Sequence, residues 1–376
     1  MAEPVLVVIF LRGGADSLSL IAPVSDPDYI AARPESLRVL RSGERPGLLL
    51  PAALADTEFR LHPAAPGLAE LFGAGDLSLI HATGLREATR SHFDAEARIE
   101  RGAASPDSGG WLGRVLAQMA PSGPLPALAV GTSAPESLRG ARTAVAPDLA
   151  DLMLLPGNGW SDTLRARLVA GFGTHGALSA TVDQMLALSD LLGQRIWVDG
   201  QARAYAPAEA YPENSPLSAP LMTVAQTIKE GLGLRIATVD YGGWDTHADQ
   251  AGQFEALLSG LSSALMAFWR DLGAHQRDVA VVVQSEFGRR LRSNESGGTD
   301  HGRAGAMMVL GPQARGGRLL GRWPGLTNGA LEDGADLAVT TDYRDVLADV
   351  LAGHMGVADM GAVFPGLAPS FSGLYG

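Results

Sequence analysis

The stretch from Val279 to Arg303 joins a short apolar run to a dense set of polar side chains, and it constrains the fold more than any other part of the chain. The apolar run, Val279–Val283, is too short for a stable helix but suits a strand that is buried on both faces. Side chains able to bind or attack a substrate follow it, namely Ser285, Glu286, Arg289, Asp300 and His301. In open parallel sheets, binding sites gather where strands end. We therefore expect a functional site directly after this strand.

Two other apolar runs end in the same way. The run Val5–Leu11 leads through two glycines to Asp16, and the run Arg235–Asp240 leads through two more glycines to Asp245 and His247. Each pattern alone is explained by an ordinary glycine turn or an Asp-capped helix. One crevice shared by several strand ends explains the repetition more simply. We expect this crevice to bind a metal ion through Asp16, Asp245, His247, Glu286, Asp300 and His301.

The composition limits the metal and the partners. The sequence has no cysteine, so disulfides and thiolate metal sites are excluded and any metal must be held by oxygen and nitrogen atoms. Carboxylates and imidazoles together suit a divalent ion such as Zn, Mn, Mg or Ca. The formal net charge of −12 argues against nucleic acid or an anionic membrane surface as a partner, because such binding requires a basic face. An anionic substrate would need a locally positive pocket.

A reactive hydroxyl is predicted at Ser91, which lies just before a stretch of helix-forming composition, Ala95–Arg101. A helix N-terminus stabilises negative charge, so a serine there can act as a nucleophile. The structural alternative is an N-cap, with Asp94 completing a capping box, and one residue can serve both purposes. The neighbouring His92 is a catalytic candidate as well. Three arginines are candidates to hold a tetrahedral oxyanion in bidentate fashion, namely Arg12, Arg90 and Arg289.

The remaining sequence sets the organisation of the chain. Residues 105–216 are rich in Pro, Gly and Ala and predict a mainly helical insertion or cap. Asp342 and His354, at the two ends of a terminal helix, predict capping roles. No run approaches the roughly 18 apolar residues of a membrane span. The first apolar run lacks the flanks of a signal peptide, so we expect a cytoplasmic protein, or a periplasmic or exported one if a leader has been removed.

Six uncommon motifs occur in the order FLRGGADSL, RSHFDA, GGWDTH, SEFGR, GGTDHGR and TTDYRDVL. Over nearly the whole chain they resemble the DUF1501 family, which is similar to the alkaline phosphatase-like superfamily of sulfatases and cofactor-independent phosphoglycerate mutases. The resemblance implies an α/β fold, with a mostly parallel central sheet flanked by helices, in one domain over residues 1–376. It also implies a divalent metal site that hydrolyses a small-molecule or glycan phosphate or sulfate ester with a Ser or Thr nucleophile.

Carried over by position, the resemblance makes Asp16 the ligand after the first strand and Ser91 the nucleophile. The sequence departs from the superfamily at two places where histidines are usual, since Glu286 and Trp244 stand at those positions. These departures leave open a non-catalytic protein that keeps the fold to bind a ligand or partner. A Ser-His-Asp hydrolase is a third interpretation, and it is disfavoured because no G-x-S-x-G motif surrounds Ser91.

Overall fold

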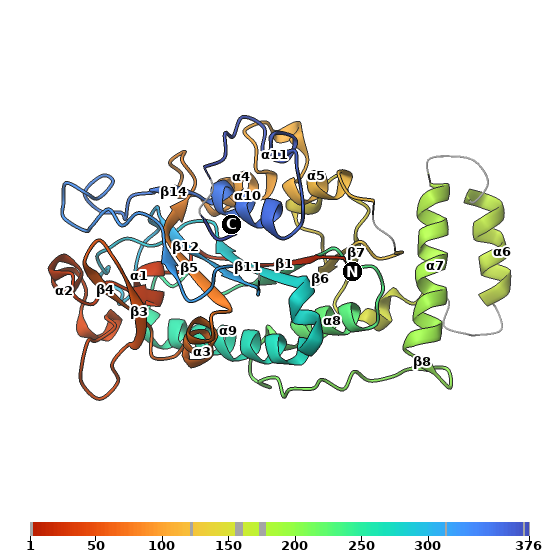
Figure 1. The fold of residues 1–376 in the computed structure, drawn as a ribbon, viewed down its shortest axis with the longest axis horizontal. Coiled ribbons are helices and arrows are strands. Elements are labelled where there is room, and N and C mark those ends of the chain that lie inside the picture. Colours follow the sequence, from red (N-terminus) through yellow and green to blue (C-terminus); the bar gives the residue numbers. More distant parts are fainter. Residues whose placement is uncertain are drawn as a thin grey trace.

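The computed structural model describes residues 3–120, 123–154, 161–172, 178–312, 314–370 and 373–375. Its centre is a large sheet with helices on both faces (Figure 1). Within the described residues the sheet has nine strands, in the order β13-β5-β12-β11-β1-β10-β6-β7, with β14 paired to β5. The strands are β1 (Val5–Leu11), β5 (Leu77–Gly84), β6 (Ala127–Val130), β7 (Ala144–Ala146), β10 (Ile236–Tyr241), β11 (Val279–Ser285), β12 (Gly305–Leu310), β13 (Leu319–Leu320) and β14 (Thr341–Asp342).

The sheet is mostly parallel. β1 lies between β10 and β11 and is parallel to both, and β6 and β7 continue the parallel set beyond β10. β12 is the exception, because it runs antiparallel to both of its neighbours, β11 and β5. The predicted α/β class with a mostly parallel central sheet is therefore confirmed.

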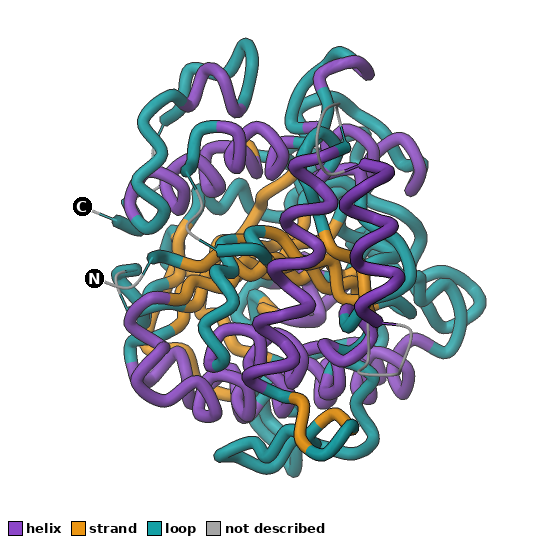
Figure 2. The backbone as a smooth tube through the Cα atoms, turned by 90° about the vertical axis from the view of Figure 1, so that its right-hand side faces the viewer, coloured by secondary structure: helices purple, strands orange, loops and turns teal. Residues whose placement is uncertain are grey.

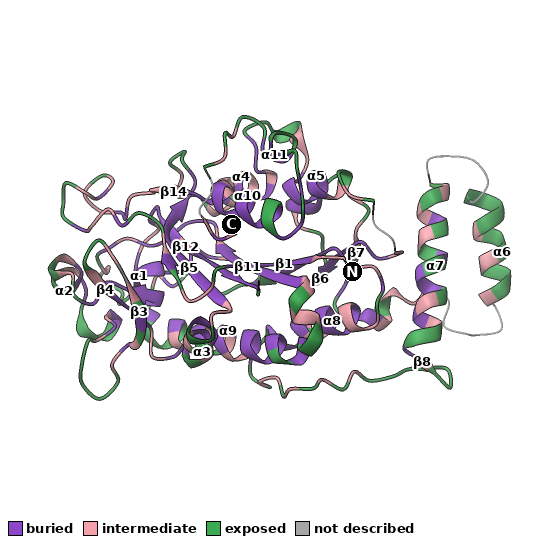
Figure 3. Ribbon diagram, viewed as in Figure 1, coloured by how far each residue is buried: buried purple, intermediate pink, exposed green. Residues whose placement is uncertain are grey.

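Helices cover both faces of this sheet (Figures 1 and 3). One face carries α3 (Pro66–Ala74), α8 (Ser218–Lys229) and α9 (Gln250–Leu272). The opposite face carries α4 (His92–Arg101), α5 (Trp111–Ala117), α10 (Tyr343–Gly353) and α11 (Met360–Val363).

The side chains of β1 alternate between two hydrophobic cores, as the pleat of a strand requires. Ile9 packs in the core that includes Leu258 of α9, whereas Val8 packs in the core that includes Trp111 of α5. Every residue of β1 is buried, so the strand reads as a continuous apolar run rather than an alternating one.

The other elements surround this three-layer body. A small antiparallel sheet of β2 (Ile21–Ala22), β3 (Leu48–Leu54) and β4 (Thr57–Leu61) lies near α1 (Ser17–Leu20) and α2 (Pro27–Ala32). β8 (Trp197–Val198) and β9 (Gln201–Ala202) form a short hairpin. The short 3-10 helices are η1 (Glu35–Leu37), η2 (Pro106–Ser108), η3 (Glu136–Leu138), η4 (Leu149–Leu152) and η5 (Gly273–Asp278).

The segment 105–216 has two parts. Its β6 and β7 belong to the central sheet, which the helical composition of this segment did not predict. Its α6 (Ser161–Phe172) and α7 (Ser179–Arg195) form a helical pair that projects from the body (Figures 1 and 2). A cap formed by the whole segment stays a prediction. In the part of the chain that the structure describes, no helix is long and apolar enough to cross a membrane.

His81 on β5 makes the fold sensitive to acid. Its imidazole is fully buried against Phe59 and Trp323, and its two nitrogens contact the Ile21 carbonyl (3.0 Å) and the Ala82 N–H (2.9 Å). Burial lowers the pKa of His81 from 6.5 to about 4. The native state therefore keeps this imidazole neutral, and the stability that depends on it is lost as pH falls from 6.5 towards 4.

We expect wild type to lose about 3 kcal/mol more unfolding free energy than His81→Gln between pH 7 and pH 4, because the glutamine does not titrate. Urea denaturation at the two pH values measures this difference. Equal losses in the two proteins would contradict the prediction.

Candidate metal centre

The predicted site segments meet at one edge of the central sheet. Leu11 of β1 pairs with Tyr241 of β10 and with Ser285 of β11, so these three parallel strands end level with one another. β12 runs antiparallel and starts at this edge with Gly305, while β5 ends there with Gly84 and leads towards α4. The edge therefore collects the loops after β1, β5 and β10 and the loop that joins β11 to β12, as expected for the carboxyl edge of such a sheet.

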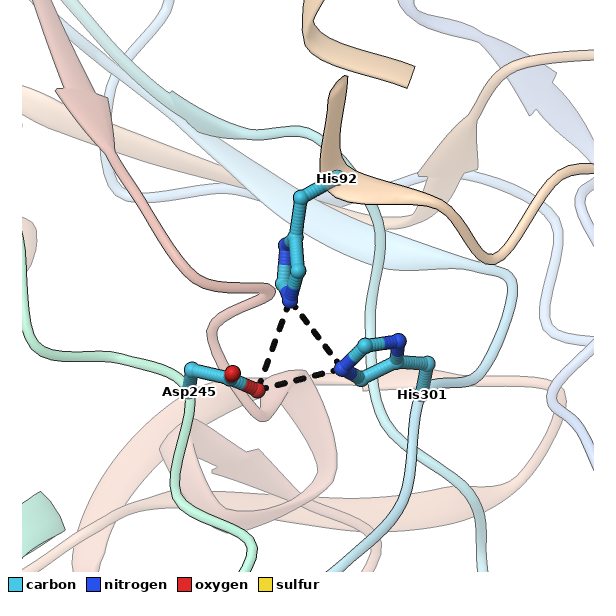
Figure 4. Close-up of side chains that lie close together, drawn as sticks. All are labelled: His92, Asp245 and His301. Atoms are coloured by element: carbon cyan, nitrogen blue, oxygen red, sulfur yellow. Dashed lines mark hydrogen bonds and ion pairs between the residues drawn. The ribbon is translucent and has the colours of Figure 1, made fainter. Parts of the chain in front are cut away.

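His92, Asp245 and His301 point their donor atoms at one another (Figure 4). The Nε2 atom of His301 lies 3.0 Å from His92 Nε2 and 3.1 Å from Asp245 Oδ1, and His92 Nε2 lies 3.4 Å from the same oxygen. His247 approaches from another side, with its Nε2 2.8 Å from His301 Nε2 and 3.0 Å from Asp245 Oδ1. Three imidazoles and one carboxylate thus converge.

The opposite ring nitrogen of each histidine has an acceptor. His92 Nδ1 contacts Glu286 Oε1 at 2.6 Å, His301 Nδ1 contacts a backbone carbonyl, that of Arg90, at 2.8 Å, and His247 Nδ1 contacts Asp300 Oδ1 at 3.3 Å. Carboxylate and carbonyl oxygens can only accept, so each Nδ1 carries a proton, and each Nε2 is directed into the cluster, where its lone pair could bind a metal ion. Three imidazole nitrogens and a carboxylate oxygen about 3 Å apart need protons or a cation among them to offset their mutual repulsion. The donor set therefore fits a metal ion, and the partners of Nδ1 are those typical of metal-bound histidines.

Glu286 forms the buried floor of this cluster. Besides His92, the carboxylate accepts hydrogen bonds from the Gly13 N–H at 2.8 Å and from Ser285 Oγ at 2.9 Å. Burial by itself would raise the pKa of Glu286, but these hydrogen bonds, with that of His92 foremost, lower it below its ordinary value. The same contact raises the pKa of His92. The Gly13 N–H, in the turn after the first strand, therefore binds a carboxylate of the protein itself.

Asp245 is held by Arg289. The Nη2 atom of Arg289 lies 2.5 Å from Asp245 Oδ1. Partial burial would raise the pKa of Asp245, yet this contact outweighs it and lowers the pKa to about 2. Asp245 is therefore an anion at neutral pH and available to a cation.

Arg289 is a structural brace, and its predicted role as an oxyanion clamp is corrected. Its side chain is fully buried, and it donates to the carbonyl groups of Gly13, Gly14, Trp244 and Thr299 as well as to Asp245. It thereby fixes the loops after β1 and β10 to the loop before β12. The loops are tightly packed, since a Cβ atom at Gly13 would lie 2.4 Å from the Asp245 nitrogen. Gly13 also has a φ of +120°, which favours glycine.

Arg12 and Arg90 are also engaged with acids of the protein. Arg12 pairs with Glu96 and Glu100 of α4 and with Asp240 of β10, so it joins the helix to the sheet. Arg90 directs its guanidinium to Asp336, and only its carbonyl group faces the cluster. Neither guanidinium is directed at the metal ligands, so their contacts do not support the predicted clamping role, which stays a prediction for these two arginines.

Asp16 does not join the cluster, and its predicted metal-ligand role is corrected. The carboxylate is fully buried and forms an ion pair with Arg33 at 2.6 Å. It also accepts hydrogen bonds from the N–H groups of Leu18 and Ser19, from Ser19 Oγ and from Gln250 Nε2. Both oxygens are thus saturated by internal donors, and the residue caps the N-terminus of α1.

Ser91 is the N-cap of α4, as the structural alternative predicted, with the Asp94 N–H 3.5 Å from its Oγ. Asp94 does not complete the capping box, since its carboxylate accepts from Arg98 and the Ser91 N–H donates to Thr89. The serine is exposed and directly precedes His92. Asp342 caps the N-terminus of α10, as predicted, and His354 occupies its C-cap position, with its Nε2 3.0 Å from the Val5 carbonyl oxygen.

Two residues near the cluster were not predicted as site residues from the sequence. Glu96 lies one turn after His92 on α4, and its carboxylate, with Glu286 and His92, forms a second set of potential metal ligands. The i, i+4 spacing on a helix was the available signal. Asn294 donates to Asp300 at 3.1 Å. This bond lowers the pKa of Asp300, and His247 and the positive charge of Arg290 lower it further.

The fold and the site define an α/β protein with a candidate metal centre at the carboxyl edge of its sheet. The chain belongs to the DUF1501 family, described as a protein of unknown function, whose family model matches residues 76–367. The family suggested by the sequence motifs is therefore confirmed. A comparison with curated protein sequences gives no match.

Several solved structures are similar to this chain. The alignment with Ps i-CgsB in complex with k-i-k-neocarrahexaose covers 97% of this chain and 75% of the Ps i-CgsB chain, at 10% identity and a TM-score of 0.44. The alignment with the PsFucS1 sulfatase from Pseudoalteromonas sp. covers 100% of this chain and 73% of the sulfatase chain, at 12% identity and a TM-score of 0.40. The alignment with alkaline phosphatase from the Antarctic bacterium TAB5 covers 83% of this chain and 93% of the phosphatase chain, at 11% identity and a TM-score of 0.36. At these identities and TM-scores, the likeness transfers neither a residue role nor a substrate to this chain.

Proposed function

We propose that the protein is a divalent-metal-dependent hydrolase of phosphate or sulfate esters. The observation that carries the proposal is the convergence of three imidazole Nε2 atoms on Asp245, while every Nδ1 is occupied by an acceptor. The ester class comes from the resemblance of the sequence motifs to the alkaline phosphatase-like superfamily.

The ligand atoms favour a borderline ion over a hard one. Mg and Ca prefer oxygen ligands, whereas Zn accepts several imidazoles together with a carboxylate. His92, Asp245 and His301 would hold the ion, with His247, Glu96 and Glu286 close enough to join or to support it. A bound divalent ion would supply Lewis-acid chemistry, polarising an ester oxygen and lowering the pKa of a nearby hydroxyl.

The protein groups would perform the remaining tasks. Ser91 offers an exposed hydroxyl beside His92, at a helix end where the dipole favours developing negative charge. The side chains of Asp245 and His247 are 47% and 43% exposed, whereas those of Glu286 and Arg289 are fully buried. A substrate would therefore approach from the solvent side, over a rigid floor.

The alternative is a non-catalytic protein that binds a metal or an anionic ligand with the same fold. One observation favours it, namely that the three arginines expected to bind the oxyanion are all engaged in internal contacts. Metal analysis of the purified protein, followed by turnover assays with an aryl phosphate and an aryl sulfate, separates the two functions.

Ser91→Ala is expected to lower kcat at least about a hundredfold while leaving the metal content unchanged, because the attacking group is lost but no metal ligand is. Both activities are measured together with the metal content by elemental analysis. Ser105→Ala is the matched control, since Ser105 is also an exposed N-cap and lies outside the cluster. Each variant loses a cap, worth about 1 kcal/mol of stability. Full turnover in Ser91→Ala would exclude the nucleophile role, and a metal-free, inactive wild type would exclude the enzyme.

A further inference from the structure

The cluster lacks a cation for an anionic substrate. The carboxylates of Asp245, Glu286 and Asp300 lie at the cluster, where Arg289 contacts Asp245 and the other two accept from histidine Nδ1 atoms. A phosphate or sulfate ester carries further negative charge, so its binding requires another positive side chain near the rim.

Arg290 lies at the solvent-exposed margin of the cluster, which we call the rim. Its backbone N–H donates to the carbonyl group of Asp300 at 3.0 Å, so it is paired with the segment that carries Asp300 and His301. The preceding residue, Arg289, forms an isolated antiparallel β-bridge with His301 through the backbone. The side chain of Arg290 is 41% exposed. Arg290 is therefore next to the ligand loop and accessible to solvent.

The guanidinium of Arg290 is not engaged as the other arginines are. Its nearest acid is Asp336, and the Arg290 Nε to Asp336 Oδ1 distance of 3.7 Å is too long for a hydrogen bond. Both of these buried atoms lack a hydrogen-bond partner. The other oxygen of Asp336 is taken by Arg90. Among the described residues, the two Nη groups of Arg290 have no hydrogen bond, so they can donate to a ligand.

We propose that Arg290 binds the phosphate or sulfate group of the substrate, in place of the three arginines that the sequence suggested. This inference rests on the proposed function, because it concerns the anion bound beside the metal. A guanidinium suits the task, since its planar fork donates two parallel hydrogen bonds to a tetrahedral oxyanion and keeps its charge at any physiological pH.

The test measures binding of inorganic phosphate and inorganic sulfate to the metal-loaded protein by isothermal titration calorimetry. Arg290→Gln is expected to weaken the affinity for the preferred anion by about tenfold to a hundredfold, because a charge-assisted hydrogen-bond pair is lost. Arg290→Lys keeps the charge without the fork and is expected to fall between wild type and Arg290→Gln. Arg292→Gln is the matched control, since Arg292 is exposed and donates to Gly334 and Asn328. It is expected to bind within about twofold of wild type.

Metal content is measured on the same samples, so that two kinds of failure can be told apart. Unchanged anion affinity in Arg290→Gln, or an equal loss in Arg292→Gln, would overturn the role of Arg290 and leave the metal centre intact. A wild type that binds metal but neither anion would also overturn it. A wild type that binds no metal would overturn the proposed function, and this inference with it.

Discussion

His301→Ala is expected to remove most of the metal affinity and, with it, metal-dependent turnover. His301 Nε2 lies within 3.1 Å of His92, His247 and Asp245, so this atom contacts each of the other three groups of the cluster. Apparent binding energies of about 10–16 kcal/mol for zinc sites are shared among about four ligands. Loss of one ligand should therefore weaken binding by about a hundredfold to a thousandfold or more, as measured by competition with a chromogenic chelator.

His275→Ala is the control for this experiment, because His275 lies in η5, before the start of β11 and so at the opposite edge of the sheet, and outside the potential ligand sets. It should keep wild-type metal content and turnover. If His301→Ala instead retained wild-type affinity and stoichiometry, the convergence of the imidazoles would have to be explained without a metal ion.

Arg33→Met is expected to lower the free energy of unfolding by about 3–5 kcal/mol, because it leaves the buried Asp16 carboxylate without its counter-ion. The ion pair is fully buried on both sides. Arg33 also donates to the backbone carbonyl groups of Arg290 and Leu291, so it connects the start of the chain to the loop that follows β11. Urea denaturation at pH 7 measures the loss.

A double variant, Asp16→Asn with Arg33→Met, provides the matched comparison. We expect it to be more stable than the sum of the two single variants predicts, since the uncompensated charge is gone. Additive losses would show that the ion pair contributes little and that packing alone explains the effect. The metal content of the folded double variant should remain that of wild type, as Asp16 holds no metal.

Much of the site could be predicted because it follows from local patterns. Short apolar runs that end in glycine and then in an acid or a histidine mark the carboxyl ends of buried strands. Asp245, His247, Glu286, Asp300 and His301 were found in this way, and the structure brings all of them to one edge of the sheet. Their exact roles were not predictable, since Glu286 and Asp300 accept hydrogen bonds from the Nδ1 atoms of histidines.

The arginines could not be assigned from the sequence. A guanidinium binds whichever carboxylate the fold places beside it, and these partners are distant in the chain. Arg90 meets Asp336, and Arg12 meets Glu100 and Asp240. Asp16 does not reach the metal site for the same reason, because Arg33 and Gln250, both distant in the sequence, donate hydrogen bonds to its carboxylate.

The sequence by itself determined the ends of the strands where chemistry gathers, because these depend on neighbouring residues and short-range periodicity. Its motifs determined the family, and the resemblance implied the α/β class with a mostly parallel sheet. Only the tertiary structure decided which charged side chains face the site and which neutralise one another inside the protein. Burying a charge without a partner is unfavourable, so the fold pairs acids and bases across long sequence separations. Arg290 is distinguished from Arg12, Arg90 and Arg289 by these long-range pairings.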